Sequence, residues 1–248
     1  MGPDQTRAAP LKVSAAIGPP IKELPSPNWD ARPDGVPIDM LVLHYTGMQS
    51  AQAALDRLRD PAARVSSHYV VDEDGTVWRL VAERHRAWHA GLSSWCGHSQ
   101  LNERSIGIEI VNPGHEWGYR CFPALQMAAV CDLCLAILGR HPIPARNVVG
   151  HSDIAPDRKQ DPGELFDWPG LAANGVGSWP GPTQDTTSVD DVPGALRTIG
   201  YAVGVGVDDG ELAVTLRAFQ RHWLPEAITG QADAATRAQL HAVLTIMA

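Results

Sequence analysis

Reactive side chains gather in three segments of this 248-residue chain. His44 closes an apolar run over residues 38–44, and Glu109 stands in the middle of another over residues 105–111. The third segment, residues 150–163, holds one histidine, three aspartates, an arginine and a lysine together with two glycines and two prolines. A stiff backbone that holds a neutral imidazole near a carboxylate is what a metal site requires.

Two histidines and one carboxylate with an open fourth position describe a catalytic zinc site, where the metal lowers the pKa of its bound water to about 7. The residue types alone leave the ligands open. The histidine candidates are His44, His151, His68, His89 and His115, and the carboxylate candidates are Asp153, Asp157 and Asp161.

Glu109 is the one acidic residue of its apolar run. Burying an unpaired carboxylate is costly, so Glu109 must face a polar cavity, an ion or a partner. A salt bridge is one interpretation. A catalytic role is the other, because desolvation near a cation tunes a carboxylate to act as a general base.

The patterns around these residues predict a compact α/β domain. Between residues 38 and 139, the sequence contains both apolar runs of strand length and segments with apolar residues at helical spacing. An Asp-Gly pair at residues 74–75 predicts a hairpin turn. Strands are expected at 38–44, 68–72, 77–81 and 105–111, and helices at 50–59 and 124–139.

Composition shifts divide the chain. Residues 1–37 hold 8 of the 20 prolines and predict an extended arm, while residues 174–188 are rich in Gly, Pro, Ser and Thr and predict a linker. The expected parts are an arm at 1–19, the domain with the reactive residues at 20–173, the linker, and a small Ala-rich domain of three helices at 189–248. Its middle helix carries a stripe of Leu212, Leu216, Phe219 and Trp223, and Asp233 is the expected N-cap of its last helix.

The net charge is −8, from 20 Lys and Arg against 28 Asp and Glu. This balance argues against a nucleic-acid partner and against a basic membrane-surface helix. The longest apolar run, residues 127–139, is too short to span a bilayer and is interrupted by Asp132. We therefore expect no transmembrane segment.

The first twenty residues contain no continuous apolar segment typical of a secretion signal, which favours a cytoplasmic location. A periplasmic location is the alternative if the N-terminus was trimmed. Cys131 and Cys134 have helical spacing and suit core packing, while Cys96 and Cys121 could bridge each other.

Five motifs in order resemble the zinc-dependent N-acetylmuramoyl-L-alanine amidases of type 2, which share a fold with peptidoglycan recognition proteins. The resemblance covers roughly residues 20–172. It rests on His-Tyr-Thr at 44–46, His-Tyr-Val at 68–70, Ala-Trp-His-Ala-Gly at 87–91, Ile-Gly-Ile-Glu at 106–109, and the loop 151–163. It implies an α/β (α+β) fold with a mixed central β-sheet flanked by helices.

The resemblance also assigns roles. It implies one zinc ion per chain held by His44, His151 and Asp161, with Glu109 activating water and Lys159 stabilising the oxyanion. Trp88 and His89 fall where the family lines its substrate groove, and His68 is expected to be structural. The implied reaction is hydrolysis of the amide between N-acetylmuramic acid, or its 1,6-anhydro form, and L-Ala of a stem peptide, with recycling of soluble muropeptides as the expected role.

The C-terminal residues resemble a three-helix peptidoglycan-binding domain through residues 216–221, 229–233 and Thr236. Residues 231–233 depart from the family pattern, and a helical cap on the catalytic domain is the alternative. For the whole chain, the expected partners are muropeptides or wall polymer. The rival functions are a recognition module without activity, a periplasmic wall-remodelling amidase, and a metal-dependent peptidase.

Overall fold

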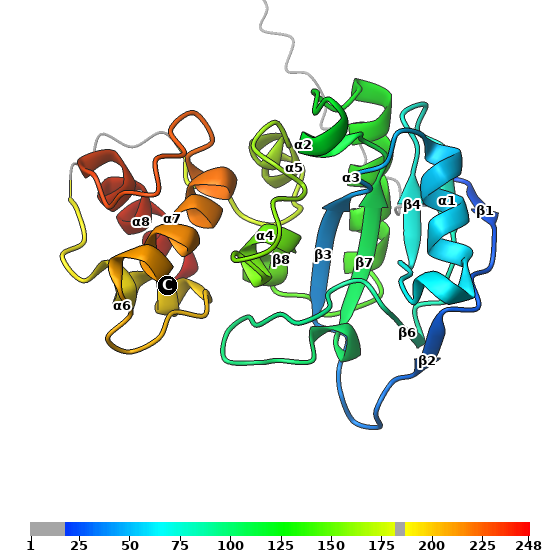
Figure 1. The fold of residues 1–248 in the computed structure, drawn as a ribbon, viewed down its shortest axis with the longest axis horizontal. Helices are drawn as coiled ribbons and strands as arrows, with labels where there is room; N and C mark the ends of the chain where they lie inside the picture. The colour runs from blue at the N-terminus through cyan, green and yellow to red at the C-terminus, as the bar shows by residue number, and fades with distance from the viewer. Residues whose placement is uncertain (1–17, 182–186) are drawn as a thin grey trace, which may run out of the picture.

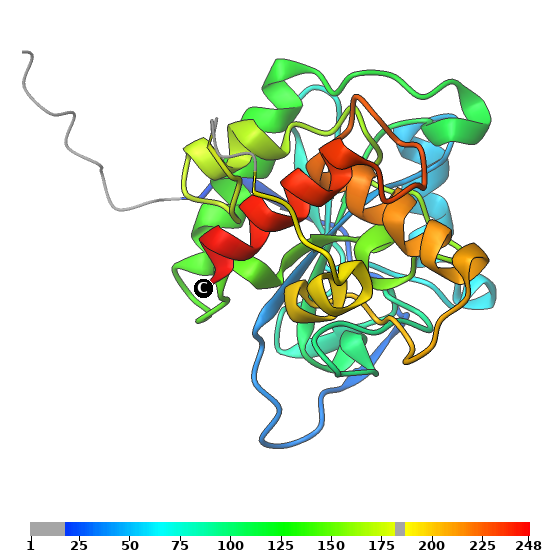
Figure 2. The same cartoon turned by 90° about the vertical axis from the view of Figure 1, so that its left-hand side faces the viewer.

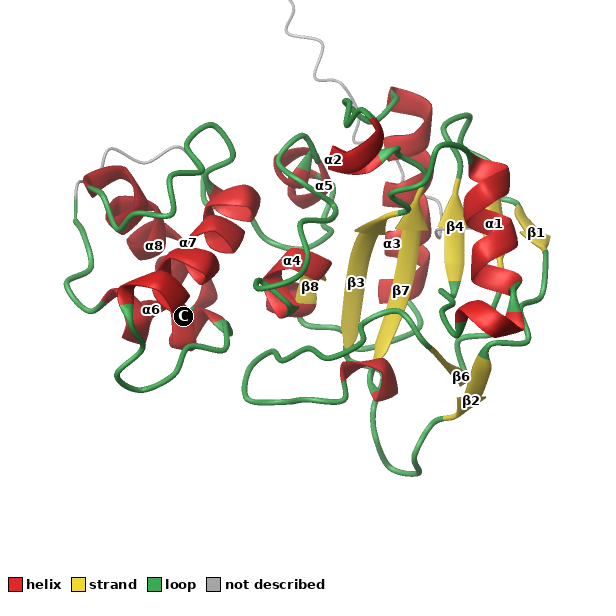
Figure 3. Ribbon diagram, in the orientation of Figure 1, coloured by secondary structure: helices red, strands yellow, loops and turns green. Residues whose placement is uncertain are grey.

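The computed structural model describes residues 18–181 and 187–248. A six-stranded sheet in the order β1-β5-β4-β7-β3-β8 forms its centre, and β2 pairs with β6 beside it (Figures 1 and 3). The strands are β1 Ile21–Glu23, β2 Trp29–Ala31, β3 Met40–Tyr45, β4 Tyr69–Val71, β5 Val77–Arg79, β6 His85–Ala87, β7 Ser105–Ile110 and β8 Val148–Gly150. The helices are α1 Ala51–Arg59, α2 Gly114–Trp117, α3 Ala124–Leu138, α4 His151–Ile154, α5 Trp168–Ala173, α6 Val192–Ile199, α7 Asp209–Trp223 and α8 Ala234–Met247.

The central sheet is mixed, which confirms the expected fold class. β4 and β5 form the predicted antiparallel hairpin, whereas β3 runs parallel to both β7 and β8. Because the carboxyl ends of parallel strands meet at one edge of a sheet, the residues that end β3, β7 and β8 lie together. The sheet topology therefore places the reactive segments at a common edge.

Residue alternation along β3 assigns its side chains to the two faces of the sheet. Leu41 and Leu43 pack into the core that α3 covers, while Met40 and Val42 point to the opposite face. Figures 1 and 2 show α3 and α1 on opposite sides of the sheet. His44 continues the series of Met40 and Val42 and so leaves the α3 core.

Local signals explain the ends of the helices. The Ser50 side chain accepts a hydrogen bond from the Ala53 N–H and caps α1, which ends just before Pro61. α3 follows Pro123 and ends at Gly139, as its apolar spacing predicts. Gly75 adopts the left-handed conformation, with φ of 83°, that the turn between β4 and β5 requires.

The arm expected over residues 1–37 is part of the folded domain from β1 onward, because β1 pairs with β5 and β2 with β6. Most of the arm expected at 1–19 lies outside the described residues. In the segment expected as a linker, Val176 is buried and Trp179 stacks on Trp223, with ring centroids 5.7 Å apart. The first part of that segment is therefore packed against the protein.

The three expected C-terminal helices are α6, α7 and α8, and they lie beside the β8 edge of the sheet (Figures 1 and 2). Asp233 caps α8 by accepting a hydrogen bond from the Thr236 N–H. Phe219 of the α7 stripe is fully buried in a cluster that also contains Val42 of β3 and Val149 of β8. The C-terminal helices thus share a core with the sheet. Across residues 18–181 and 187–248, every helix falls short of the length and apolar character needed to cross a membrane.

Candidate active site

His44 and Glu109 are neighbours across two parallel strands. They are register partners in the pairing of β3 with β7, and each is the fifth residue of its six-residue strand. Ile106, Ile108 and Ile110 pack into the α3 core, so Glu109 points to the other face together with His44. Both side chains therefore lie on the same face of the sheet, where Glu109 lines a cavity and His44 contacts His151, which also lines it.

His151 comes from the next strand of the sheet, at the point where β8 gives way to α4. The chain then folds back, and the Ser152 N–H donates a hydrogen bond of 2.9 Å to the Asp161 carbonyl. Gly150 permits this return, because a Cβ atom there would lie 2.7 Å from Cδ of Pro162. The loop thereby brings Asp161 beside His151.

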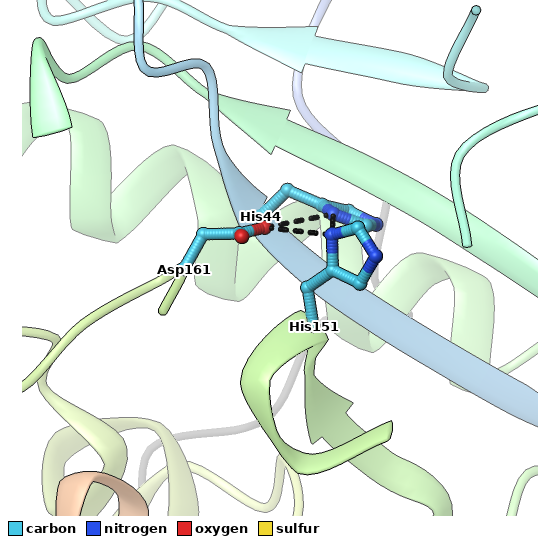
Figure 4. A group of neighbouring side chains, drawn as sticks. All are labelled: His44, His151 and Asp161. Carbon is cyan, nitrogen blue, oxygen red and sulfur yellow. Dashed lines mark hydrogen bonds and ion pairs between the residues drawn. The ribbon is translucent and has the colours of Figure 1, made fainter. Parts of the chain in front are cut away.

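The three expected metal ligands converge on one point (Figure 4). His44 Nδ1 and His151 Nδ1 are 2.9 Å apart, and each lies 3.0 Å from Asp161 Oδ2. Tetrahedral coordination at typical zinc distances separates ligand atoms by about 3.3 Å. A pair of imidazoles and a carboxylate at nearly this spacing fits a zinc ion, with space left for water or substrate.

Electrostatics favour the metal-binding protonation states. Burial, with a contribution from His151, lowers the pKa of His44 to about 4, so its imidazole is neutral near pH 7. Burial alone would raise the pKa of Asp161, but His151 and His44 outweigh it and hold the pKa below its ordinary value. The neutral imidazole of His44 and the ionised carboxylate of Asp161 are the forms that bind a metal.

Glu109 has a different environment. Its Oε2 atom is buried and has no hydrogen-bond partner among the described residues. Burial, together with the negative charge of Asp161, raises the pKa of Glu109 well above its ordinary value, while Lys159 opposes the shift. A carboxyl group of this kind can hold and release a proton.

A cavity of about 700 Å³ opens over these residues. Its lining includes the reactive residues Glu109, His151, Lys159 and Asp161, together with Trp88, His89 and Arg57. This volume lies within the usual range for a small-molecule site. Six of the seven residues to which the family resemblance assigned roles therefore line one cavity, and the seventh, His44, contacts His151 and Asp161 at its wall.

The other candidate ligands lie elsewhere. Asp153 is buried and accepts hydrogen bonds from the Gly150 N–H, the Tyr201 hydroxyl and His222 Nδ1. Asp157 is exposed. His68 is buried behind the site, where its Nδ1 accepts from the Gly107 N–H.

His115 sits at the rim of the cavity rather than among the metal ligands. Its ring contacts the Tyr45 hydroxyl at 2.9 Å and a Glu164 oxygen at 3.1 Å. Sequence reasoning did not find Glu164 or the role of Ser105, which contacts His89. Ser105 is the first polar residue of β7 on the face of Glu109, and that alternation is the signal that could have revealed it.

The cluster of two histidines and an aspartate could hold a metal ion, and it lies next to a buried unpaired glutamate at the carboxyl ends of parallel strands, an arrangement typical of metal-dependent hydrolases. Residues 34–164 match the N-acetylmuramoyl-L-alanine amidase family. The chain belongs to this family and is an amidase.

Related proteins and solved structures support this family assignment. The chain is 37% identical over 233 residues to the N-acetylmuramoyl-L-alanine amidase AmiD of Escherichia coli, covering 84% of this chain and 82% of the relative. It superposes on a complex of AmiD from E. coli with a TM-score of 0.77 at 37% identity, covering 86% of this chain and 91% of the other. AmpDh3 from Pseudomonas aeruginosa gives a TM-score of 0.75 at 35% identity, covering 85% and 93%.

Proposed function

We propose that this chain uses zinc to hydrolyse the amide between N-acetylmuramic acid, or its 1,6-anhydro form, and L-Ala of a peptidoglycan stem peptide. The observation that carries the proposal is the convergence of His44, His151 and Asp161 at the wall of the cavity that Glu109 lines. The solved AmiD structure is a complex with anhydro-N-acetylmuramic acid-L-Ala-D-γ-Glu-L-Lys, and one AmpDh3 structure is a complex with an anhydromuramic pentapeptide. The first ligand contains this linkage, and the second joins the same class of sugar to a peptide.

His44, His151 and Asp161 would hold a single zinc ion. When bound, zinc would polarise the amide carbonyl and lower the pKa of the attacking water. Glu109 accepts the proton of this water and then delivers it to the leaving amine, a task that its raised pKa suits. Lys159 places a cation near the oxygen that becomes negative, and one such electrostatic donor contributes about 100–1,000-fold in rate.

The cavity wall orients the substrate. Trp88 and His89 follow β6 and line the cavity beside the reactive groups. Trp88 offers a partly exposed ring, which suits packing against a sugar or a peptide side chain. We propose that both residues contact the substrate, His89 through the carbon edge of its ring.

Product analysis tests the proposal against its rivals. Incubation with soluble anhydro-muropeptide should release free sugar and free peptide, identified by mass spectrometry, and activity should disappear on chelation and return with zinc. Binding without product release would favour a recognition module. Cleavage of a stem peptide that lacks the sugar would favour a metal-dependent peptidase.

We further propose muropeptide recycling in the cytoplasm as the biological role. All four cysteines are free, and Cys121 is exposed, as suits a reducing compartment. Fractionation of the untagged protein and comparison of soluble anhydro-muropeptide with intact sacculi would test this. Residence in the periplasm with a preference for sacculi would favour wall remodelling.

We also propose three parts for the chain: a catalytic domain at 20–173, a linker at 174–188 and a peptidoglycan-binding-like domain at 189–248. The shared core of Val42, Val149 and Phe219 supports a C-terminal domain that braces the catalytic domain rather than swinging on a tether. Affinity of this domain for wall polymer would be additional to the bracing role.

A further inference from the structure

The ring of His89 lies directly behind the expected metal ligand His44. His89 Nδ1 is 3.0 Å from His44 Nε2, and the two ring planes are nearly perpendicular, at 86°. On its other side, His89 Nε2 lies 3.1 Å from the Ser105 hydroxyl, which donates a hydrogen bond of 2.6 Å to the Leu101 carbonyl. His44, His89 and Ser105 are all buried.

The Leu101 carbonyl sets the direction of every hydrogen bond in this chain of groups. A carbonyl only accepts, so Ser105 uses its single proton there and must accept from His89 Nε2–H. In a neutral His89 ring, Nδ1 then carries no proton and accepts from His44 Nε2–H. His44 is left with its Nδ1 lone pair free, and Nδ1 is the atom that faces His151 and Asp161.

The backbone is shaped around this ring. On β7, the positions that face the site are Ser105, Gly107 and Glu109, and a Cβ atom on Gly107 would lie 2.5 Å from Cγ of His89. The N–H groups of His89 and Ala90 both donate to Asn102 Oδ1, at 3.1 and 2.8 Å. His89 is thus held from both its ring and its backbone.

We propose that His89 and Ser105 form a relay that positions His44 and keeps its Nδ1 unprotonated and aimed at the metal. This proposal rests on the zinc site of the proposed function. His89 is a positioning residue here. Because both of its ring nitrogens are used, it has no nitrogen left to hydrogen-bond a substrate. Ligand imidazoles in metal sites are commonly fixed by such outer contacts, whose loss weakens metal affinity by about 10–100-fold.

Two substitutions of similar shape separate the relay from simple packing. In His89→Asn the amide oxygen can take the place of Nδ1 and accept from His44, whereas His89→Leu offers no acceptor. The zinc Kd of each full-length variant is measured by competition with a chromogenic chelator, and the melting temperature of the metal-free protein is recorded in parallel. We expect His89→Leu to bind zinc about 10–100-fold more weakly and His89→Asn to stay within about threefold of the wild type.

Ser105→Ala supplies an independent arm. It removes the acceptor that orients His89, so it should weaken zinc binding in the wild-type background. In a His89→Leu background it should cause no further loss of zinc affinity, because the relay is already broken. If His89→Leu does not fold, Ser105→Ala compared with the wild type decides the question. An unchanged zinc Kd in that variant overturns the relay.

The relay is likewise overturned if His89→Leu binds zinc as tightly as the wild type. Equal weakening in His89→Asn and His89→Leu would also overturn it, since packing alone explains that result. A wild-type chain that binds no zinc would instead remove the proposed function, and the relay with it.

Discussion

The hydroxyl of Tyr201 donates a hydrogen bond of 2.6 Å to Oδ1 of Asp153. The two residues belong to different parts of the chain, since Asp153 lies on α4 two residues after His151 and Tyr201 follows α6. His222 of α7 holds the second oxygen of the same carboxylate at 2.7 Å. The turn that carries a proposed metal ligand is therefore fastened to the C-terminal helices.

This relationship predicts that Tyr201→Phe destabilises the whole protein. Loss of a buried hydrogen bond to a carboxylate costs about 1–3 kcal/mol in free energy of unfolding. Chemical denaturation followed by fluorescence measures the loss. A phenylalanine substitution at exposed Trp117, which lines the cavity rim, is the control and should change stability little.

Removal of residues 189–248 should lower activity on soluble muropeptide and on sacculi alike. Truncation removes Leu196, Ile199 and Phe219 from the buried cluster that they share with the sheet, and each apolar side chain left uncovered there costs about 1.5–3 kcal/mol. Thermal unfolding and parallel digests of the two substrates measure this. A selective loss on sacculi, with unchanged stability, would instead support a wall anchor that raises local enzyme concentration.

Asp161→Ala should cause loss of the metal and of most of the activity, because it removes one of the three proposed ligands. Metal analysis of the purified variant checks this. Asp157→Ala is the matched control, since Asp157 lies in the same loop but is exposed and outside the cluster. Full metal occupancy in Asp161→Ala would contradict the assignment.

Glu109→Gln should keep metal and fold but lose turnover, because the amide has nearly the same shape and cannot accept the proton of water. Loss of general-base assistance costs about 100–10,000-fold in kcat. Steady-state kinetics together with metal analysis measure the two effects. A variant with near-native turnover and a lower melting temperature would make Glu109 structural.

The environment of Glu83 predicts that the stability of the protein falls at acid pH. Burial alone would raise its pKa, but hydrogen bonds from Arg140, Tyr69 and His141 prevail and lower the pKa from 4.5 to about 2. Its contribution to stability is therefore complete above about pH 4.5 and is lost as the pH falls towards 2. It amounts to about 3 kcal/mol.

The measurement is the free energy of unfolding of the wild type and Glu83→Gln between pH 6 and pH 3. The gap between the two proteins should be largest at pH 6 and narrow as the pH falls. A gap that does not depend on pH would show that the carboxylate charge of Glu83 contributes nothing.

Much of the fold was predictable from sequence because its signals are local. Apolar runs marked β3 and β7 to within two residues, and helical spacing placed the ends of α1 and α3 to within one residue. The three-residue strands β1, β2, β6 and β8 were missed, and β1 and β2 show why. Three residues carry too little periodicity, and only pairing with β5 and β6 makes them strands.

Of the site, the sequence by itself determined that His44 and Glu109 were unusual, since a polar residue inside an apolar run needs a physical reason to be there. The choice of Asp161 over Asp153 and Asp157 came from family resemblance, because spacing within a loop does not say how that loop folds back. The tertiary structure places Asp161, and neither of the other two aspartates, in the cluster with His44 and His151. The missing Cβ of Gly150 lets Asp161 approach His151.

No local pattern in the sequence could predict the role of Asp153. Its carboxylate accepts hydrogen bonds from Tyr201 and His222, which lie 48 and 69 residues further along the chain. The ring of His89, which follows β6, is oriented by Ser105 of β7. Such roles depend on hydrogen bonds that form only once distant segments have packed together, and a sequence displays the donors and acceptors without displaying their pairing.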